Sequence, residues 1–240
     1  MADFATHPRV PGVWAHRGAS RARPENTVEA FVEAAREGAD GVELDVRRTR
    51  DGALAVCHGA ALADGRLVAA VDAADLPPQV PLLGEALDAC AGMIVDIEIK
   101  NARGEPDHDP EETAAAGVVG LVRERGLHDR VIVSSFSLAT IDRIAVLDAD
   151  IRRGLLVVPG AEAAAAAALA AEHGHQAVHP YHESVDGALV ATAHELGLAV
   201  HTWTVDAPGR IRWLVDLGVD AVITNLPGLA IATLRAAGAA

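Results

Sequence analysis

The residues best suited to chemistry lie within the first 58 positions of the chain. His16 and His58 bracket this stretch, Arg17 follows the first histidine, and Glu43 and Asp45 lie two residues apart in the segment GVELDVRRT. Histidines exchange protons near neutral pH, and a guanidinium forms a two-point contact with phosphate or carboxylate. The combination indicates acid–base chemistry on an anionic substrate.

The two carboxylates need a positive partner, because an unpaired buried charge is costly. One interpretation is a salt bridge to Arg17, Arg47 or Arg48. The other is a hard divalent cation, Mg²⁺ or Ca²⁺, which takes oxygen ligands. The pair by itself leaves both interpretations open.

Alternation and turn signals predict how these residues are positioned. The segment VWAHRG reads as a buried strand, and GVELDVRRT alternates so that its two carboxylates share one face. Between them VEAFVEAAREG reads as a helix that Asn26 or Thr27 caps and Gly38 ends. This is a βαβ unit, and LAVCH follows as a further short strand.

A second polar strand follows at MIVDIEIKN. Asp96, Glu98 and Lys100 share one face, and aliphatic residues occupy the other. Polar groups on the inner face near the carboxyl end of a barrel strand indicate catalysis rather than stability.

The remaining chain alternates strands and helices, which favours a closed parallel (β/α)₈ TIM barrel of the α/β class. We expect residues 1–240 to form one barrel domain, with 59–81 as a short irregular insertion after the second strand. No glycine-rich dinucleotide or P-loop motif follows a strand.

Composition narrows the partners. The net charge of −14 comes from 34 acidic and 20 basic residues, which argues against nucleic acid and against an anionic membrane surface. Residues 1–12 lack the pattern of a signal peptide, and no apolar run is long enough to span a bilayer, so we expect no membrane insertion and a cytoplasmic location. Cys57 and Cys90 read as two buried thiols in a reducing compartment. Oligomeric state stays open, including pairing through the alanine-rich helix near residues 163–168.

Several motifs together resemble the glycerophosphodiester phosphodiesterases. The resemblance extends in order over nearly the whole chain, through His16-Arg17, PENT (24–27), Glu43-x-Asp45, His58, IEIK (97–100), SSF (134–136), WTV (203–205) and DAVITNLP (220–227). One departure is Asn225, which stands where the family usually has aspartate.

The resemblance implies a divalent metal ion, Mg²⁺ or Ca²⁺, on Glu43, Asp45 and Glu98. It implies a small-molecule glycerophosphodiester substrate that is hydrolysed to sn-glycerol 3-phosphate and an alcohol. In the family the glycerol 2-hydroxyl is thought to attack first, and direct attack by water is the simpler alternative.

The remaining site residues follow from the same resemblance. His16 and His58 would be general acid and base on opposite sides of the phosphorus, in an order that the sequence leaves open. Arg17 and Lys100 would lie near the phosphate, and Trp203 would pack on the glycerol carbons. Lys100 could instead only neutralise the carboxylates, and Trp203 could only fill the barrel.

Two other functions remain open at this point. One is a phospholipase D-like or phosphoinositide-type phosphodiesterase acting on lysophospholipids, and the other is a barrel that binds metal or phosphate without catalysis. Glu25 reads either as a carboxylate at a helix start or, by the resemblance, as a residue that borders the metal site, and Asp96 has no role beyond that of a buried hydrogen-bonding group. His175, His179 and His182 cluster in sequence, but their spacing does not support a zinc site.

Overall fold

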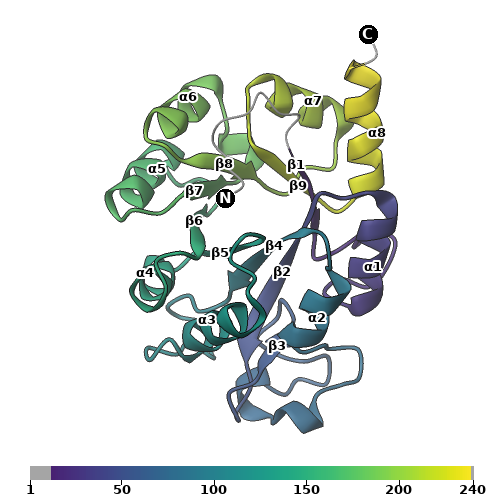
Figure 1. Cartoon of the computed structure of the whole chain (residues 1–240), viewed down its shortest axis with the longest axis vertical. Coiled ribbons are helices and arrows are strands. Elements are labelled where there is room, and N and C mark those ends of the chain that lie inside the picture. The colour runs from purple at the N-terminus through teal and green to yellow at the C-terminus, as the bar shows by residue number, and fades with distance from the viewer. Residues whose placement is uncertain (1–11, 239–240) are drawn as a thin grey trace.

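A computed structural model describes residues 12–238, in which a closed barrel of eight parallel strands confirms the predicted TIM barrel (Figure 1). The sheet runs in the order β1-β9-β8-β7-β6-β5-β4-β2, and β1 pairs with β2 to close it. The barrel strands are β1 (Gly12–His16), β2 (Gly41–Arg48), β4 (Ile94–Ile99), β5 (Val131–Ser135), β6 (Arg152–Val157), β7 (Ala177–Pro180), β8 (Ala199–Thr202) and β9 (Ala221–Thr224).

Eight helices surround the described barrel, and the first and last lie side by side (Figure 1). They are α1 (Val28–Glu37), α2 (Leu83–Ala89), α3 (Thr113–Arg125), α4 (Leu138–Leu147), α5 (Ala163–Glu172), α6 (Gly187–Glu195), α7 (Pro208–Asp216) and α8 (Pro227–Gly238). The aliphatic faces of β2 and β4 pack with residues of α1, α2 and α3 in one hydrophobic cluster. Their polar faces therefore point into the barrel.

The predicted cap residues position the first helix. The Thr27 side chain accepts a hydrogen bond from the Ala30 amide at 3.2 Å, and Gly38 ends the helix in the left-handed conformation at φ 88°. Of the two cap candidates, Thr27 has this role, and Asn26 is free for another contact.

A ninth strand lies beside the barrel. The short strand β3 (Leu54–Val56) confirms the further strand predicted for LAVCH and pairs antiparallel with β2; His58 lies two residues after its end. Residues 59–81 contain two short 3₁₀ turns, η1 (Val68–Ala70) and η2 (Ala73–Asp75), and extend from the lower end of the view (Figure 1). Leu62, Val68 and Val71 of this segment pack on Ala55 of β3.

Some expectations from the sequence need correction or lie outside the described residues. Cys90 is buried but Cys57 is partly exposed, so the prediction of two buried thiols was wrong for Cys57; both are free. The prediction about a signal peptide concerns residues 1–11, which lie outside the described part of the chain. Among residues 12–238 no helix has the length and apolar character needed to cross a membrane.

Candidate active site

Three carboxylates meet at the barrel mouth. Strand register places Asp45 beside Glu98 and His16 beside Glu43, so residues far apart in sequence share adjacent strands. One oxygen of each of Glu43, Asp45 and Glu98 lies within 4.8 Å of the others, and all three side chains are buried. We refer to these three residues as the mouth cluster.

Two cations neutralise part of the mouth cluster. The Lys100 ammonium lies 2.9 Å from Asp45 Oδ1 and 2.5 Å from Glu98 Oε1, and Arg17 Nε lies 3.1 Å from Asp45 Oδ2. The salt bridge to Arg17 is therefore present. The alternatives through Arg47 and Arg48 were wrong, because those side chains pair with acidic residues of the loop after β4.

Two residues near the cluster adopt a conformation that L-amino acids rarely use. Arg17 and Asn26 both have φ 57°, a left-handed backbone that costs about 1–3 kcal/mol and is frequent at functional sites. The Arg17 amide donates to Glu43 Oε2 at 3.1 Å. Asn26 contacts Asp45 twice, donating from Nδ2 to Oδ2 at 2.8 Å and accepting the Asp45 amide at 3.2 Å. The PENT motif thus orients Asp45, a role that the sequence did not reveal.

The electrostatics of the mouth cluster favour an added cation. Burial, followed by repulsion from Asp45, raises the pKa of Glu43 well above its ordinary value and raises the pKa of Glu98 to about 8. Burial acts in the same direction on Asp45, but Lys100 and Arg17 together outweigh it and lower the pKa to about 2. Glu43 Oε1 is buried without a hydrogen-bond partner among the described residues. An all-oxygen donor set with an unused buried oxygen fits a hard divalent cation.

His16 is oriented by a residue from the other end of the chain. Its Nδ1 lies 2.7 Å from Asn225 Oδ1, and its Nε2 faces Glu43 at 3.9 Å. The side-chain Nδ2 of Asn225 donates to Asp206 Oδ2 at 2.8 Å, and its backbone N–H donates to Asp206 Oδ1 at 2.9 Å. Because Asp206 accepts from Nδ2, the Asn225 oxygen must face His16, and it therefore takes the Nδ1 proton. The lone pair of neutral His16 is then on Nε2, beside the mouth cluster.

This arrangement exposes two gaps in the sequence analysis. Asn225 was noted only as a departure from the family pattern, but it contacts the predicted catalytic histidine. Asp206 was not identified, although it directly follows the WTV motif and so stood beside a recognised signal.

Burial is the main cause that lowers the pKa of His16, with Arg17 next, so the neutral imidazole is favoured at pH 7.

His58 lies at the exposed rim of the mouth, just after β3. It is near enough to Asp45 for the two charges to interact. Its imidazole has no hydrogen-bond partner among residues 12–238, whereas its carbonyl oxygen accepts from Arg47 Nε at 2.9 Å. The two histidines therefore differ: His16 is held by an amide, and His58 is held through its backbone.

The residues predicted to contact substrate surround the same mouth. Glu25, which is exposed, holds Arg17 Nη1 at 3.0 Å and so helps to orient the guanidinium. Trp203 packs edge-on against Phe136 and Tyr181, with ring centroids 5.7 and 5.5 Å away. Its indole Nε1 donates to the His179 carbonyl at 2.9 Å. Phe136 connects these rings to the charged cluster, since Lys100 Nζ lies 5.8 Å from its ring centroid.

A family model described as the glycerophosphoryl diester phosphodiesterase family matches residues 16–229. The chain belongs to this family. It is 29% identical over 246 residues to a glycerophosphodiester phosphodiesterase of Caldanaerobacter subterraneus subsp. tengcongensis, covering 94% of this chain and 98% of that one. Members of this family are hydrolases, and the chain is accordingly an enzyme.

Solved structures agree with this assignment. A phosphodiesterase of Oleispira antarctica in complex with the product sn-glycerol-3-phosphate has a TM-score of 0.85 and 26% identity, covering 94% of this chain and 97% of that one. A glycerophosphodiester phosphodiesterase of Thermotoga maritima has a TM-score of 0.80 at 24% identity over 94% of this chain and 99% of its own, which shows the shared fold.

The three histidines that lie close together in sequence, His175, His179 and His182, lie in different places in the structure. His179 points into the barrel, with Nδ1 3.3 Å from Asp96 and Nε2 3.0 Å from His201 Nδ1. His182 begins the 3₁₀ turn η3 (His182–Ser184). His175 faces outward to Asp142. The three therefore do not form one site, and Asp96 is a buried partner of His179.

A second group of possible metal ligands lies on the outer wall of the barrel. Asp142, His173 and His175, here called the outer cluster, also bring ligand atoms within 4.8 Å of one another. Arg153 Nε donates to His175 Nδ1 at 3.3 Å, so the ring proton of His175 is on Nε2, which faces Asp142 at 3.0 Å. A metal on Nε2 would require that proton to move to the nitrogen that faces Arg153.

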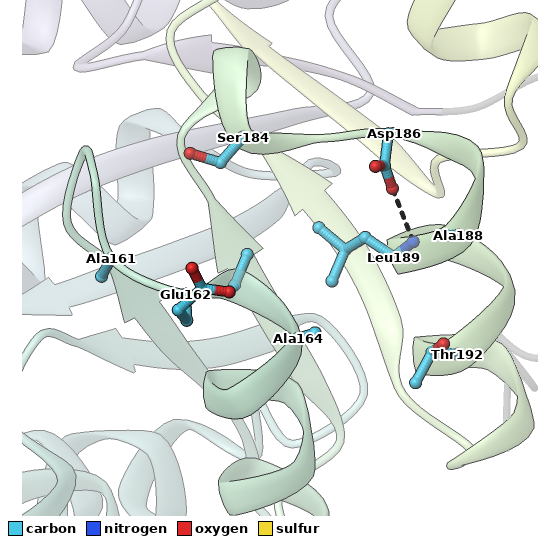
Figure 2. Close-up of a pocket in the computed structure, with 9 residues that line it drawn as sticks. Ala161, Glu162, Ala164, Ser184, Asp186, Ala188, Leu189 and Thr192 are labelled. Carbon is cyan, nitrogen blue, oxygen red and sulfur yellow. Dashed lines mark hydrogen bonds between the residues drawn. The ribbon is translucent and has the colours of Figure 1, made fainter.

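A pocket on the outer surface of this family member lacks the predicted catalytic groups. It has a volume of about 330 Å³ and lies between α5 and α6 (Figure 2). Its lining includes four alanines, and Asp186, its acidic residue on the α6 side, uses its carboxylate to cap α6 through the Leu189 amide at 2.8 Å. None of the predicted site residues lines it.

Proposed function

We propose that this enzyme hydrolyses glycerophosphodiesters to sn-glycerol 3-phosphate and an alcohol, with a divalent cation on Glu43, Asp45 and Glu98. The observation that carries the proposal is the convergence of His16, His58 and this buried carboxylate cluster at one barrel mouth. The bound product of the Oleispira antarctica relative supports the same product here.

The cation site calls for oxygen ligands, which suits Mg²⁺ or Ca²⁺ rather than a soft metal. A divalent cation supplies Lewis acidity at a non-bridging phosphate oxygen. Lys100 contacts Asp45 Oδ1 and Glu98 Oε1, so it keeps these two carboxylates close together. Its ammonium would also lie near the phosphate.

We assign His16 to accept the proton of the attacking hydroxyl, because Asn225 leaves the lone pair on Nε2. His58, at the exposed rim, then protonates the oxygen of the departing head-group alcohol. In the second step the histidines exchange roles if a cyclic phosphate forms. Arg17, anchored by Glu25 and Asp45, presents its guanidinium to the phosphate, and Trp203 packs on the glycerol carbons.

Leaving-group dependence tests this division of roles. When a p-nitrophenyl diester of glycerol 3-phosphate is cleaved, the leaving group is p-nitrophenolate, which is stable as an anion and needs no proton donor. His58→Ala should therefore lose far less activity with this substrate than with glycerophosphocholine, whereas His16→Ala should lose about 10²-fold with both. The reverse pattern would exchange the two roles.

The substrate class is tested by comparing glycerophosphocholine with lysophosphatidylcholine under the same conditions. We expect release of sn-glycerol 3-phosphate from the first and little turnover of the second. Preferential cleavage of the lysolipid would instead support a phospholipase-type enzyme. A cytoplasmic location stays a prediction.

A further inference from the structure

Arg47 has contacts that the proposed chemistry does not use. It lies near the end of β2 on the same face as Glu43 and Asp45, two residues beyond Asp45. Although it is at the barrel mouth, its side chain is only 4% exposed. A buried guanidinium needs several acceptors, and its contacts therefore show which parts of the mouth it connects.

The acceptors of Arg47 come from two separate segments. Nε donates to the carbonyl oxygen of His58 at 2.9 Å. Nη1 donates to Glu105 Oε2 and Asp107 Oδ2, each at 2.7 Å. One segment follows β3, and the other belongs to the loop that follows β4, the strand that carries Glu98. One side chain therefore joins the backbone of His58 to the strand that carries a carboxylate of the mouth cluster.

The Arg47 contacts matter for His58 because its imidazole has no hydrogen-bond partner of its own among the described residues. The location of the ring depends on where its backbone is held. The buried Asp107 carboxylate, 4% exposed, gives Arg47 a rigid counterpart on the opposite loop. The planar guanidinium can donate to the His58 carbonyl and to Asp107 at the same time, whereas the single ammonium of a lysine lacks that geometry.

We propose that Arg47 is a positioning residue that fixes His58 over the mouth cluster by tying its backbone to the loop after β4. The proposal rests on the proposed function, in which His58 protonates the leaving group. It makes Arg47 necessary for turnover although Arg47 touches neither the substrate nor the carboxylates of the mouth cluster.

Arg48 provides a matched control. It is the next residue on β2 and pairs with Asp109 of the same loop at 3.3 Å, but it does not contact His58. Arg48→Met should loosen the loop near Asp109 and leave His58 held. Any effect that Arg47→Met shares with Arg48→Met reports on the loop, and any effect found only in Arg47→Met reports on His58.

Hydrogen exchange on the full chain tests the physical claim without any assay of activity. In Arg47→Met and Arg47→Lys we expect faster amide exchange in residues 55–62 as well as in 101–112. In Arg48→Met we expect faster exchange only in 101–112. Unchanged exchange of residues 55–62 in both Arg47 variants would overturn the proposal, even if the enzyme acted on a different substrate.

A double-mutant cycle tests the catalytic consequence. Arg47→Met should lower kcat for glycerophosphocholine by about 10- to 100-fold, the scale of a 1 Å misplacement, with the calorimetric affinity for Mg²⁺ retained. In the His58→Ala background the same change should have little further effect, because the group that it positions is absent. Independent, multiplicative losses would contradict the proposal. An inactive wild type would refute the proposed function alone, and the exchange data would still decide the role of Arg47.

Discussion

Two clusters in the described part of the chain have ligand spacing, but their hydrogen bonding differs. The mouth cluster and the outer cluster each bring three ligand atoms within 4.8 Å. In the outer cluster Asp142 accepts from both His173 and His175, and Arg153 occupies the remaining nitrogen of His175. In the mouth cluster Glu43 keeps a buried oxygen without a partner among the described residues. Spacing by itself therefore does not distinguish the two clusters; the unused acceptor at the mouth does.

The comparison also concerns charge. At the mouth, burial and mutual repulsion raise the pKa values of Glu43 and Glu98, so an added cation relieves an existing cost. At the outer cluster the guanidinium of Arg153 lies against the site and would repel a cation. We expect changes at the mouth to alter catalysis and cation binding, and changes at the outer cluster to alter only stability.

The largest difference should come from the histidines. His16→Ala and His58→Ala should each lower the turnover of glycerophosphocholine by about 10²-fold or more, the usual scale for acid–base groups. The control His175→Ala should keep turnover near the wild-type rate. Steady-state rates at saturating substrate measure all three, and near-wild-type turnover in either mouth variant would refute its role.

Cation affinity should separate the clusters next. Glu43→Ala should weaken Mg²⁺ or Ca²⁺ binding by more than about 100-fold, because the loss of an outer-shell partner already costs about 10- to 100-fold. Its circular dichroism should stay native-like. Asp142→Ala should bind the cation like the wild type. Isothermal titration calorimetry measures all three affinities, and loss of binding in Asp142→Ala instead of Glu43→Ala would contradict the prediction.

Proton release should then sharpen the account of the mouth. The pKa of Glu98 is raised to about 8, so this carboxyl is mostly protonated at pH 7 before a cation binds. Binding requires the ionised form, and we expect about one proton or more to leave per cation at pH 7. The apparent affinity should rise with pH up to about 8. Calorimetry in two buffers of different ionisation enthalpy measures the release, and an identical enthalpy in both would contradict it.

The smallest expected effect is on stability at the outer cluster. Burial is the main cause that lowers the pKa of His175 below 6.5. The like charge of Arg153 acts in the same direction, although Asp142 acts to raise the pKa. The folded state therefore favours neutral His175, and its contribution is present above about pH 6.5 and is lost as the pH falls below that value. His175→Asn should lower the free energy of unfolding by about 1 kcal/mol at pH 7.5. At pH 5.5 the difference in this free energy between the variant and the wild type should be smaller. Urea unfolding at both pH values would show a constant difference if this interpretation is wrong.

Much of the fold could be predicted from the sequence because its signals are local. Alternation placed Glu43 and Asp45 on one strand face, and Thr27 and Gly38 set the ends of α1. The order of strands and helices then favoured a closed parallel barrel. The family resemblance predicted that His16, His58 and Glu98 share one site.

The contacts that orient these residues could not be predicted, because they join distant segments. Asn225 holds His16 across 209 positions, and Arg47 reaches Asp107 across 60. Neither has a periodic pattern, and each depends on the closure of the barrel. The outer cluster was missed for the same reason, since Asp142 on α4 meets His175 only after both strands and helices have packed.

The most direct test of the account is add-back of Mg²⁺ and Ca²⁺, separately, to chelator-treated enzyme in the presence of glycerophosphocholine. The readout is sn-glycerol 3-phosphate, for the wild type and for the Glu43→Ala and Asp142→Ala variants. We predict that at least one cation restores the wild type and Asp142→Ala but not Glu43→Ala. Full activity without any cation, or restoration of Glu43→Ala with loss in Asp142→Ala, would contradict the assignment of the mouth cluster.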